Sequence, residues 1–274
     1  LTTQPYSIFM SECPYLDGVL IDKRLPRWNL FYLNNLKKTL AKYDFSKVFD
    51  LQNSSRTKFY KRFVIKNIEW SSTETTLEIG QKKKNFDKDP VLDRLELQIK
   101  KSGIETEFTK NIDLSWAVEN TSYLVKKYTN REYILLFPFC SPKLKNKKWP
   151  YYKELIQKLK QEFKNKYSVL IAPGPNEIKE ANEFNAKVVL DNNEHITLKT
   201  LVSLIHSAKL IIANDTGPAH IASHLDKKGL VLFGSHTSAK KVSIENFNFK
   251  AISVENLNDL DVNTVLKEAK AKLD

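Results

Sequence analysis

The sequence predicts an α/β protein built on a parallel, doubly wound sheet. Two observations lead to this prediction: the second half of the chain alternates short β-branched runs with amphipathic helical patterns, and the order of strand and helix is strict. Strands that alternate with helices pair in parallel, because each helix returns the chain across one face of the sheet. With 274 residues, 41% of them hydrophobic, the chain can bury a sizeable core.

The second half holds the regular alternation. Each expected strand is a short apolar run, and each expected helix has apolar residues every three or four positions. The expected strands are 133–139, 167–174, 186–190, 209–213 and 229–234, and the expected helices are 151–163, 176–184, 197–208 and the segment after 214–220. These residues are expected to form one domain, 128–274.

The first half is less regular and is expected to form a second α/β domain, 1–127. Its expected strands are 18–22, 46–52 and 63–70, and its expected helices are 29–42, 90–102 and 113–127. Residues 31–40 have the spacing of an amphipathic core helix rather than of a membrane anchor. The charged segment 80–90 is expected to be a loop, and 127–133 is the predicted linker.

Composition points to a cytoplasmic protein. No apolar run approaches the roughly 18 residues of a membrane span, and the first residues lack the basic-then-apolar order of a signal peptide. Cys13 and Cys140 are too few for a disulfide framework, which fits a reducing compartment.

The net charge is +12, and 38 of the 44 basic residues are lysines. Proteins that read nucleic acids rely on the bidentate guanidinium of arginine, so we expect no nucleic-acid partner. Two interpretations of the charge remain. It is either a solvated basic surface of the kind that an AT-rich genome produces, or a surface for phosphate-bearing partners such as nucleotides, acidic glycolipids or an anionic membrane face.

The segment NDTGPAH, 214–220, joins an expected strand to an expected helix. Ligands of open parallel sheets bind at such junctions, where helix N-termini present free N–H groups. Pro218 in the first turn would leave the amides of Thr216 and Gly217 to face an anion, and Asp215 could accept hydrogen bonds from sugar hydroxyls. The alternative is a capped helix after a buried strand, and the motif alone does not separate the two.

Two further junctions carry charged residues. The turn after the expected strand 133–139 contains Ser141 and a cluster of lysines: Lys143, Lys145, Lys147 and Lys148. Such lysines can neutralise the charge that grows on a diphosphate leaving group without a metal. The turn APGPNE, 172–177, places Glu177 where a carboxylate could bind a ribose diol. The alternatives are a basic turn and an exposed glutamate at a helix start.

Four motifs in this order and spacing, KKWP, APGPNE, AKLIIANDTGPAHIA and LFGSHTS, resemble glycosyltransferase family 9, the ADP-heptose heptosyltransferases of lipopolysaccharide core synthesis. DTGPAHIA is the most specific of them. The resemblance covers about residues 131–240 well and the first half more weakly. It implies a GT-B enzyme, in which two Rossmann-like domains face a cleft.

The resemblance also implies the reaction and its site. Such enzymes move a heptose or a related sugar from an ADP-sugar donor to a lipopolysaccharide core or similar glycolipid, with inversion and with neither metal nor cofactor. The implied donor contacts are Lys147 to the diphosphate, Glu177 to the adenosine ribose, Asp215, Thr216 and Gly217 to heptose and phosphate, Ser141 as the small hydroxyl before the lysine, and His220 within the signature. Lys147 and Asp215 are the implied catalytic residues.

Other interpretations need features that are weaker here. His220 and His224 have a spacing that can bind a metal, but HIASH lacks the glutamate of the metalloprotease motif and only His236 offers a third ligand, so no metal is expected. A nucleotide-sugar epimerase would need its own carboxylates and histidines. A nucleotide-sugar or polyanion-binding protein without transfer activity would need only the junctions or the charge.

The resemblance raises one expectation about the start of the chain. Family members open with a strand, a loop that carries Gly-Asp, a helix and a second strand, and the loop aspartate is the presumed base. The segment 1–22 resembles the end of that second strand and the residues after it. We therefore expect an N-terminally incomplete domain, a base upstream of Leu1 and weak or absent transfer. A glycolipid acceptor would be met peripherally at the inner membrane face.

Overall fold

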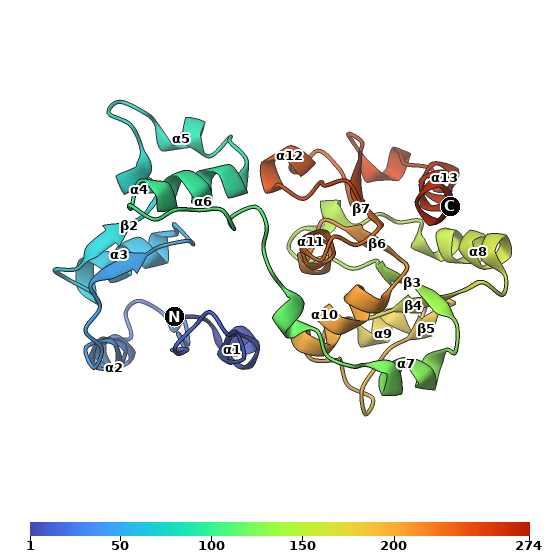
Figure 1. The fold of residues 1–274 in the computed structure, drawn as a ribbon, viewed down its shortest axis with the longest axis horizontal. Coiled ribbons are helices and arrows are strands. Elements are labelled where there is room, and N and C mark those ends of the chain that lie inside the picture. The colour runs from blue at the N-terminus through green and yellow to red at the C-terminus, as the bar shows by residue number, and fades with distance from the viewer. The chain divides into compact units, whose positions relative to one another are not determined.

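The computed structural model describes all residues from Leu1 to Asp274, and contacts divide them into two compact units, Leu1–Asn111 and Ile112–Asp274 (Figure 1). This division comes before the predicted boundary between residues 127 and 128. The reason is local packing: Leu124 is fully buried in the core of the second unit, and Thr200 donates a hydrogen bond to Glu119 over 3.0 Å. The segment that precedes the predicted boundary therefore packs with the second unit.

Unit 2 is built on a six-stranded, wholly parallel sheet with the order β5-β4-β3-β6-β7-β8. The strands are β3 Glu132–Phe137, β4 Tyr167–Ile171, β5 Lys187–Val188, β6 Leu210–Asn214, β7 Gly229–Phe233 and β8 Phe249–Ser253. The predicted doubly wound sheet is confirmed. Strand order reverses direction between β3 and β6, which is the switch point where such sheets bind ligands.

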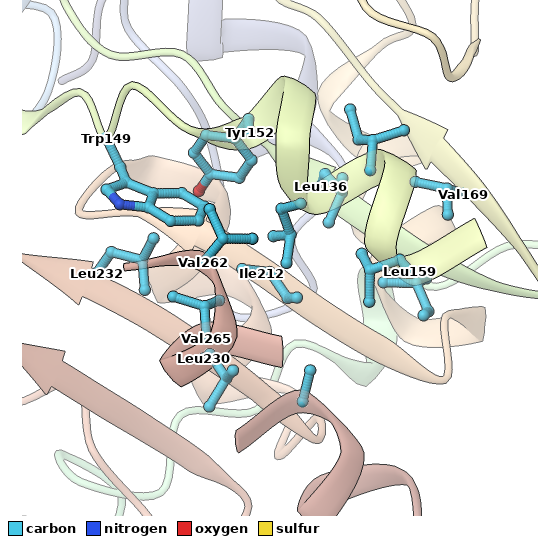
Figure 2. Close-up of a cluster of buried hydrophobic side chains, with 14 of the residues drawn as sticks. Leu136, Trp149, Tyr152, Leu159, Val169, Ile212, Leu230, Leu232, Val262 and Val265 are labelled. Carbon is cyan, nitrogen blue, oxygen red and sulfur yellow. The ribbon is translucent and has the colours of Figure 1, made fainter. Parts of the chain in front are cut away.

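Helices cover both faces of this sheet, because successive strand side chains point to opposite sides. Ile134 and Leu136 of β3 lie in one core with α8 Tyr152–Phe163 and α13 Val262–Leu273, and Figure 2 shows this packing. Leu135 lies in the other core, together with residues of α7 Ser122–Tyr128, α10 Leu198–Ser207 and α11 Gly217–His224. The sheet is thus the middle of three layers.

Several elements of unit 2 differ from their predicted extents. The predicted helix 176–184 is reduced to α9 Ile178–Ala181, and the predicted helix 113–127 is broken into η1 Ser115–Ala117 and α7 by the extended backbone of Val118. The strand and helix patterns did not predict β8 or α13, although Asp261 caps α13 by accepting from the amides of Asn263 and Thr264. The remaining short helices are η2 Lys145–Lys147, α12 Ala239–Val242 and η3 Leu257–Asp259.

Unit 1 contains a two-stranded parallel sheet, β1 Lys47–Phe49 and β2 Glu69–Ser71. Its helices are α1 Gln4–Ser11, α2 Leu30–Leu40, α3 Ser55–Phe63, α4 Thr73–Thr76, α5 Lys83–Phe86 and α6 Val91–Lys100. Helices predicted at 29–42 and 90–102 are confirmed as α2 and α6. Its core gathers Tyr32, Leu36, Leu40, Tyr60 and Val64.

Three predictions for unit 1 were wrong in detail. The run 18–22 is not a strand: its backbone makes only an isolated bridge between Thr2 and Ile21, since no longer segment lies beside it. The predicted loop 80–90 contains α5. The predicted strand 63–70 is reduced to β2, because α3, which was not predicted, extends to Phe63; Ser54 and Thr57 form the capping box of α3. No helix of the protein combines the length and apolarity that a membrane crossing requires.

Candidate functional site

The predicted junctions of unit 2 meet along one edge of its sheet. Residues 138–150 follow β3, 172–177 follow β4, and 214–220 begin at the last residue of β6. Since β4, β3, β6 and β7 are consecutive neighbours in a parallel sheet, their carboxyl ends lie side by side. The loop after β7 completes this row.

Asp215 lies at the centre of the site. Its side chain is only 3% exposed, and Nζ of Lys147 lies 2.6 Å from Oδ2. Nε2 of His236 lies 3.1 Å from the same oxygen, and Nε2 of His220 lies 3.5 Å from Oδ1. A buried carboxylate is thus surrounded by one ammonium and two imidazoles.

The buried side-chain amide of Asn214, next to Asp215, holds the loop after β3 that carries Lys147. The backbone N–H of Trp149 donates to Oδ1 of Asn214 over 3.2 Å, and Nδ2 of Asn214 donates to the carbonyl of Phe139 over 3.3 Å. Asn214 therefore ties both ends of the loop after β3 to the end of β6. The buried Trp149 indole is itself fixed by a hydrogen bond of 2.9 Å to the carbonyl of Leu260.

The surroundings of Asp215 favour its charged form. Burial by itself would raise the pKa of this carboxyl, because it disfavours the charge. Hydrogen bonds from His220, Lys147 and His236, together with the charge of Lys147, outweigh burial and hold the pKa well below its usual range. Asp215 is therefore a carboxylate at neutral pH and a weak base.

Helix α11 begins beside this carboxylate. Thr216 is its N-cap residue with extended backbone, and its hydroxyl bonds to the carbonyl of Asn214 rather than to the helix. The amides of Thr216 and Gly217 donate to no protein acceptor, and Pro218 has no N–H. A Cβ placed on Gly217 would meet no atom within 4 Å. The helix start therefore presents free donors toward open space, which suits an anion.

Two predicted contact residues lie apart from the Asp215 cluster. Glu177 accepts a hydrogen bond of 2.7 Å from the amide of Gly174, within its own turn, and burial raises the pKa of its carboxyl. Ser141 is exposed in the turn after β3, where its carbonyl accepts from the amide of Leu144. Both remain on the same edge of the sheet, but only Lys147, His220 and Asp215 are brought into direct contact.

The neighbouring lysines differ from Lys147. Lys143 and Lys145 are exposed, and Lys148 pairs with Glu180 of α9. The turn η2 also lines a polar pocket of about 320 Å³, together with Ser235 and Glu255 from the ends of β7 and β8. One lysine of the basic turn therefore joins the buried cluster, and the others border solvent.

His236 is the functional candidate that sequence reasoning missed. It was considered only as a third metal ligand, yet its ring stacks on Phe233 with centroids 5.8 Å apart and meets Asp215. Its place in LFGSHTS, directly after a strand adjacent to β6, was the signal that could have found it. No group of three or more histidine, cysteine, aspartate or glutamate side chains has the arrangement of a metal site.

Comparison with solved structures shows the same fold in several glycosyltransferases. Escherichia coli heptosyltransferase WaaC with ADP is 16% identical, with a TM-score of 0.71, and the match covers 98% of this chain and 88% of that one. E. coli ADP-heptose lps heptosyltransferase II is 19% identical, with a TM-score of 0.70 and coverages of 99% and 87%. The fold is thus α/β and matches GT-B glycosyltransferase structures.

Two further structures show how far the likeness extends. The family 9 glycosyl transferase from Veillonella parvula is 15% identical, with a TM-score of 0.74 over 99% of this chain and 87% of that one. A UDP-GlcNAc 2-epimerase from Methanocaldococcus jannaschii is 16% identical, with a TM-score of 0.59 over 100% and 84%. These identities are low, so the likenesses establish the fold alone.

The sequence itself identifies the family. No curated protein matches it. The model of glycosyltransferase family 9 (heptosyltransferase), however, matches residues 33–267 and so spans most of both units. Together with the resemblance of the DTGPAHIA segment, this match shows that the chain belongs to glycosyltransferase family 9.

Proposed function

We propose that the chain is an inverting, metal-independent glycosyltransferase that moves a heptose or a related sugar from an ADP-sugar to a lipopolysaccharide core or similar glycolipid. The observation that carries the proposal is the Lys147–Asp215 pair at the switch point of the sheet, beside the free amides of α11. Support comes from two structures of a relative, WaaC, one with ADP and one with ADP-2-deoxy-2-fluoro heptose.

In this proposal Lys147 is the electrostatic catalyst. Its side chain is 20% exposed, so its ammonium can turn from Asp215 toward a diphosphate at the start of α11. Negative charge grows on the diphosphate as the bond to the sugar breaks, and an ammonium placed there stabilises the transition state more than the bound donor. The amides of Thr216 and Gly217 and the hydroxyls of Thr216 and Ser141 bind the phosphate oxygens.

Asp215 orients the transferred sugar. Its pKa is held low, which makes it a poor general base but a good acceptor for sugar hydroxyls. When Lys147 turns to the diphosphate, Nε2 of His236 remains 3.1 Å from Oδ2, within hydrogen-bonding distance of the buried carboxylate, and His220 lies 3.5 Å from Oδ1. Deprotonation of the acceptor hydroxyl is therefore assigned to a carboxylate outside this cluster.

Glu177 is the proposed contact of the adenosine ribose. It lies after β4, the strand next to β3 on the side away from β6. Its carboxylate would exchange the bond to the Gly174 amide for bonds to the ribose diol. The adenosine would then extend from the phosphate site toward β4.

The acceptor and the location follow from the same proposal. A glycolipid acceptor lies in a membrane, and the net charge of +12 would draw the protein peripherally to the anionic cytoplasmic face. Acidic headgroups and the acceptor's own anionic groups would then be the partners of the lysine-rich surface.

A ligand panel followed by a transfer assay tests this function. ADP and ADP-sugars should raise the melting temperature, whereas UDP and GDP should not. Whatever transfer of heptose from ADP-heptose to a lipopolysaccharide core acceptor is detected by mass spectrometry of the product should be equal with and without EDTA. Stabilisation by heparin but by no nucleotide would instead support a polyanion-binding protein. ADP binding without transfer would support a nucleotide-sugar-binding protein.

A further inference from the structure

Three large apolar side chains are exposed within four consecutive residues of unit 1. Trp28, Leu30 and Phe31 are 80%, 75% and 78% exposed. We call these three side chains the apolar tip. They lie at the start of α2, which Figure 1 shows at the opposite end of unit 1 from α5 and α6. Single exposed apolar residues are common, but three neighbours of this size form a patch that mostly marks an interaction surface.

The helix that carries the apolar tip is anchored in the core. Its other face buries Tyr32, Leu36 and Leu40 at intervals of four residues. The side chain of Asn29, between Trp28 and Leu30, caps the helix by accepting from the amide of Tyr32 over 2.9 Å. The tip therefore projects from a helix whose direction is set by packing.

Hydrogen bonds also fix the residues that precede the apolar tip. The Arg56 guanidinium on α3 donates to the carbonyls of Leu25 and Arg24 over 3.0 and 3.3 Å. Arg27 donates to the Ser55 hydroxyl over 2.7 Å. These bonds order the backbone before the tip, so little conformational entropy remains to be lost when the tip binds a surface.

Along the chain, the exposed charges on either side of the apolar tip all have one sign. Between Asp22 and Asp44 the chain contains no acidic residue, and Asp22 is buried, where it accepts hydrogen bonds from Tyr32 and Tyr60. The same stretch carries six basic residues: Lys23, Arg24, Arg27, Lys37, Lys38 and Lys42. An exposed tryptophan among cations is typical of a surface that enters the interface of an anionic membrane.

We propose that the apolar tip and these basic residues dock unit 1 on an anionic lipid bilayer. Trp28, Leu30 and Phe31 enter the boundary between headgroups and acyl chains, where the tryptophan N–H remains among polar groups. The basic residues bind lipid phosphates. The inference deepens the proposed function, since a glycolipid acceptor would lie in that bilayer, but its evidence is independent of the donor site.

Vesicle binding by the full chain tests the surface. We expect the wild type to sediment with vesicles of phosphatidylcholine containing about 30% phosphatidylglycerol and much less with phosphatidylcholine alone. Joint substitution of Trp28→Ser, Leu30→Ser and Phe31→Ser should weaken binding about tenfold or more, because the buried apolar area is lost. The matched control replaces two exposed apolar residues elsewhere, Ile79→Ser and Phe247→Ser, and should bind like the wild type.

Salt separates the two components of the surface. Lys37→Gln together with Lys38→Gln should weaken binding at low salt and flatten its salt dependence, because fewer charges are screened. The triple serine variant should retain only binding that moderate salt abolishes. Unchanged binding of that variant, or an equal loss in the Ile79 and Phe247 control, would overturn the proposal.

Three further measurements test for contact with lipid, for contact with a second copy of the chain and for independence from the donor site. Trp28→Phe keeps an apolar ring, so it should retain vesicle binding while losing the quenching of tryptophan emission by brominated lipid. If the wild type does not bind vesicles but forms a dimer, and the triple variant is a monomer, the tip binds a second copy of the chain and the proposed membrane contact is wrong. ADP binding should be the same in the triple variant and the wild type, so a chain that binds vesicles but not ADP would refute only the proposed function.

Discussion

Nζ of Lys147 lies 2.6 Å from Oδ2 of Asp215, although the two residues follow different strands, β3 and β6. The pair links the basic turn after β3 to the start of α11, and it places a partly exposed cation beside a buried anion. In the proposed reaction the Lys147 ammonium stabilises the charge on the diphosphate, and the Asp215 carboxylate orients the sugar. Substitutions at the two positions should therefore have different effects.

Lys147→Ala should lower turnover more than it lowers affinity for the donor, by roughly 100-fold or more in kcat, because the charge that the lysine neutralises grows during bond breaking. Steady-state kinetics and calorimetric titration with ADP measure the two effects. Lys145→Ala, an exposed lysine of the same turn, is the control and should change little. Equal losses in turnover and affinity would contradict the role of Lys147.

Asp215→Asn should abolish most transfer while the fold persists. The amide keeps the shape of the side chain but loses the charge that orients sugar hydroxyls, and Thr216, not Asp215, occupies the N-cap position of α11. Circular dichroism and a transfer assay on the same preparation measure both. A variant that fails to fold would show that Asp215 is mainly a structural residue.

The lowered pKa of Asp215 predicts how its contribution to stability varies with pH. Burial opposes the charge, but hydrogen bonds from His220, Lys147 and His236 reverse the effect, so the folded pKa lies below the reference value of 3.8. The contribution, on the order of 2 kcal/mol, is therefore fully present above about pH 5 and declines as pH falls below 3.8 toward the folded pKa.

Denaturant unfolding at several pH values checks this window. The difference in unfolding free energy between the wild type and Asp215→Asn should shrink as the pH falls below the reference value of 3.8. A difference that instead grows on acidification would show that the carboxyl is protonated more readily in the folded protein than in the unfolded chain, which is the opposite of a lowered pKa.

Gly217→Ala should leave stability unchanged or slightly higher and weaken ADP binding about tenfold, because a Cβ there meets no protein atom but would crowd a phosphate on the helix amides. Gly229→Ala is the matched control, for which we expect the opposite effect on stability. Its Cβ would lie 2.4 Å from the Phe249 ring and 2.8 Å from the Ile211 carbonyl, so it should lower the melting temperature. Full ADP affinity in Gly217→Ala would remove this helix start from the phosphate site.

The sequence by itself determined most of the sheet of unit 2, without β8, and most of the residues at its edge. Alternating apolar strands and amphipathic helices are local patterns, and they predicted β3, β4, β6 and β7 with the junctions after them. Asp215, Thr216, Gly217 and Lys147 could be singled out because parallel sheets bind ligands at these junctions. Their roles in donor binding stay predictions.

Tertiary structure alone decided which junction residues touch. The strand order brings His236 after β7 to Asp215 after β6, and the buried amide of Asn214 holds the loop that carries Lys147; none of these contacts has a local pattern. In unit 1, too, a local sequence pattern did not predict a tertiary contact. The run 18–22 looks like a strand, but a strand requires a neighbour to pair with, and only Thr2 lies beside it.

The apolar tip shows most clearly that a sequence pattern does not predict which side chains remain exposed. The spacing of α2 predicted a helix with a buried face, and Tyr32, Leu36 and Leu40 confirm it. Nothing in that spacing shows that Trp28, Leu30 and Phe31 remain in solvent. A periodic pattern records which side chains can share a face, whereas their exposure depends on which other elements pack against that face, and only the folded chain supplies those elements.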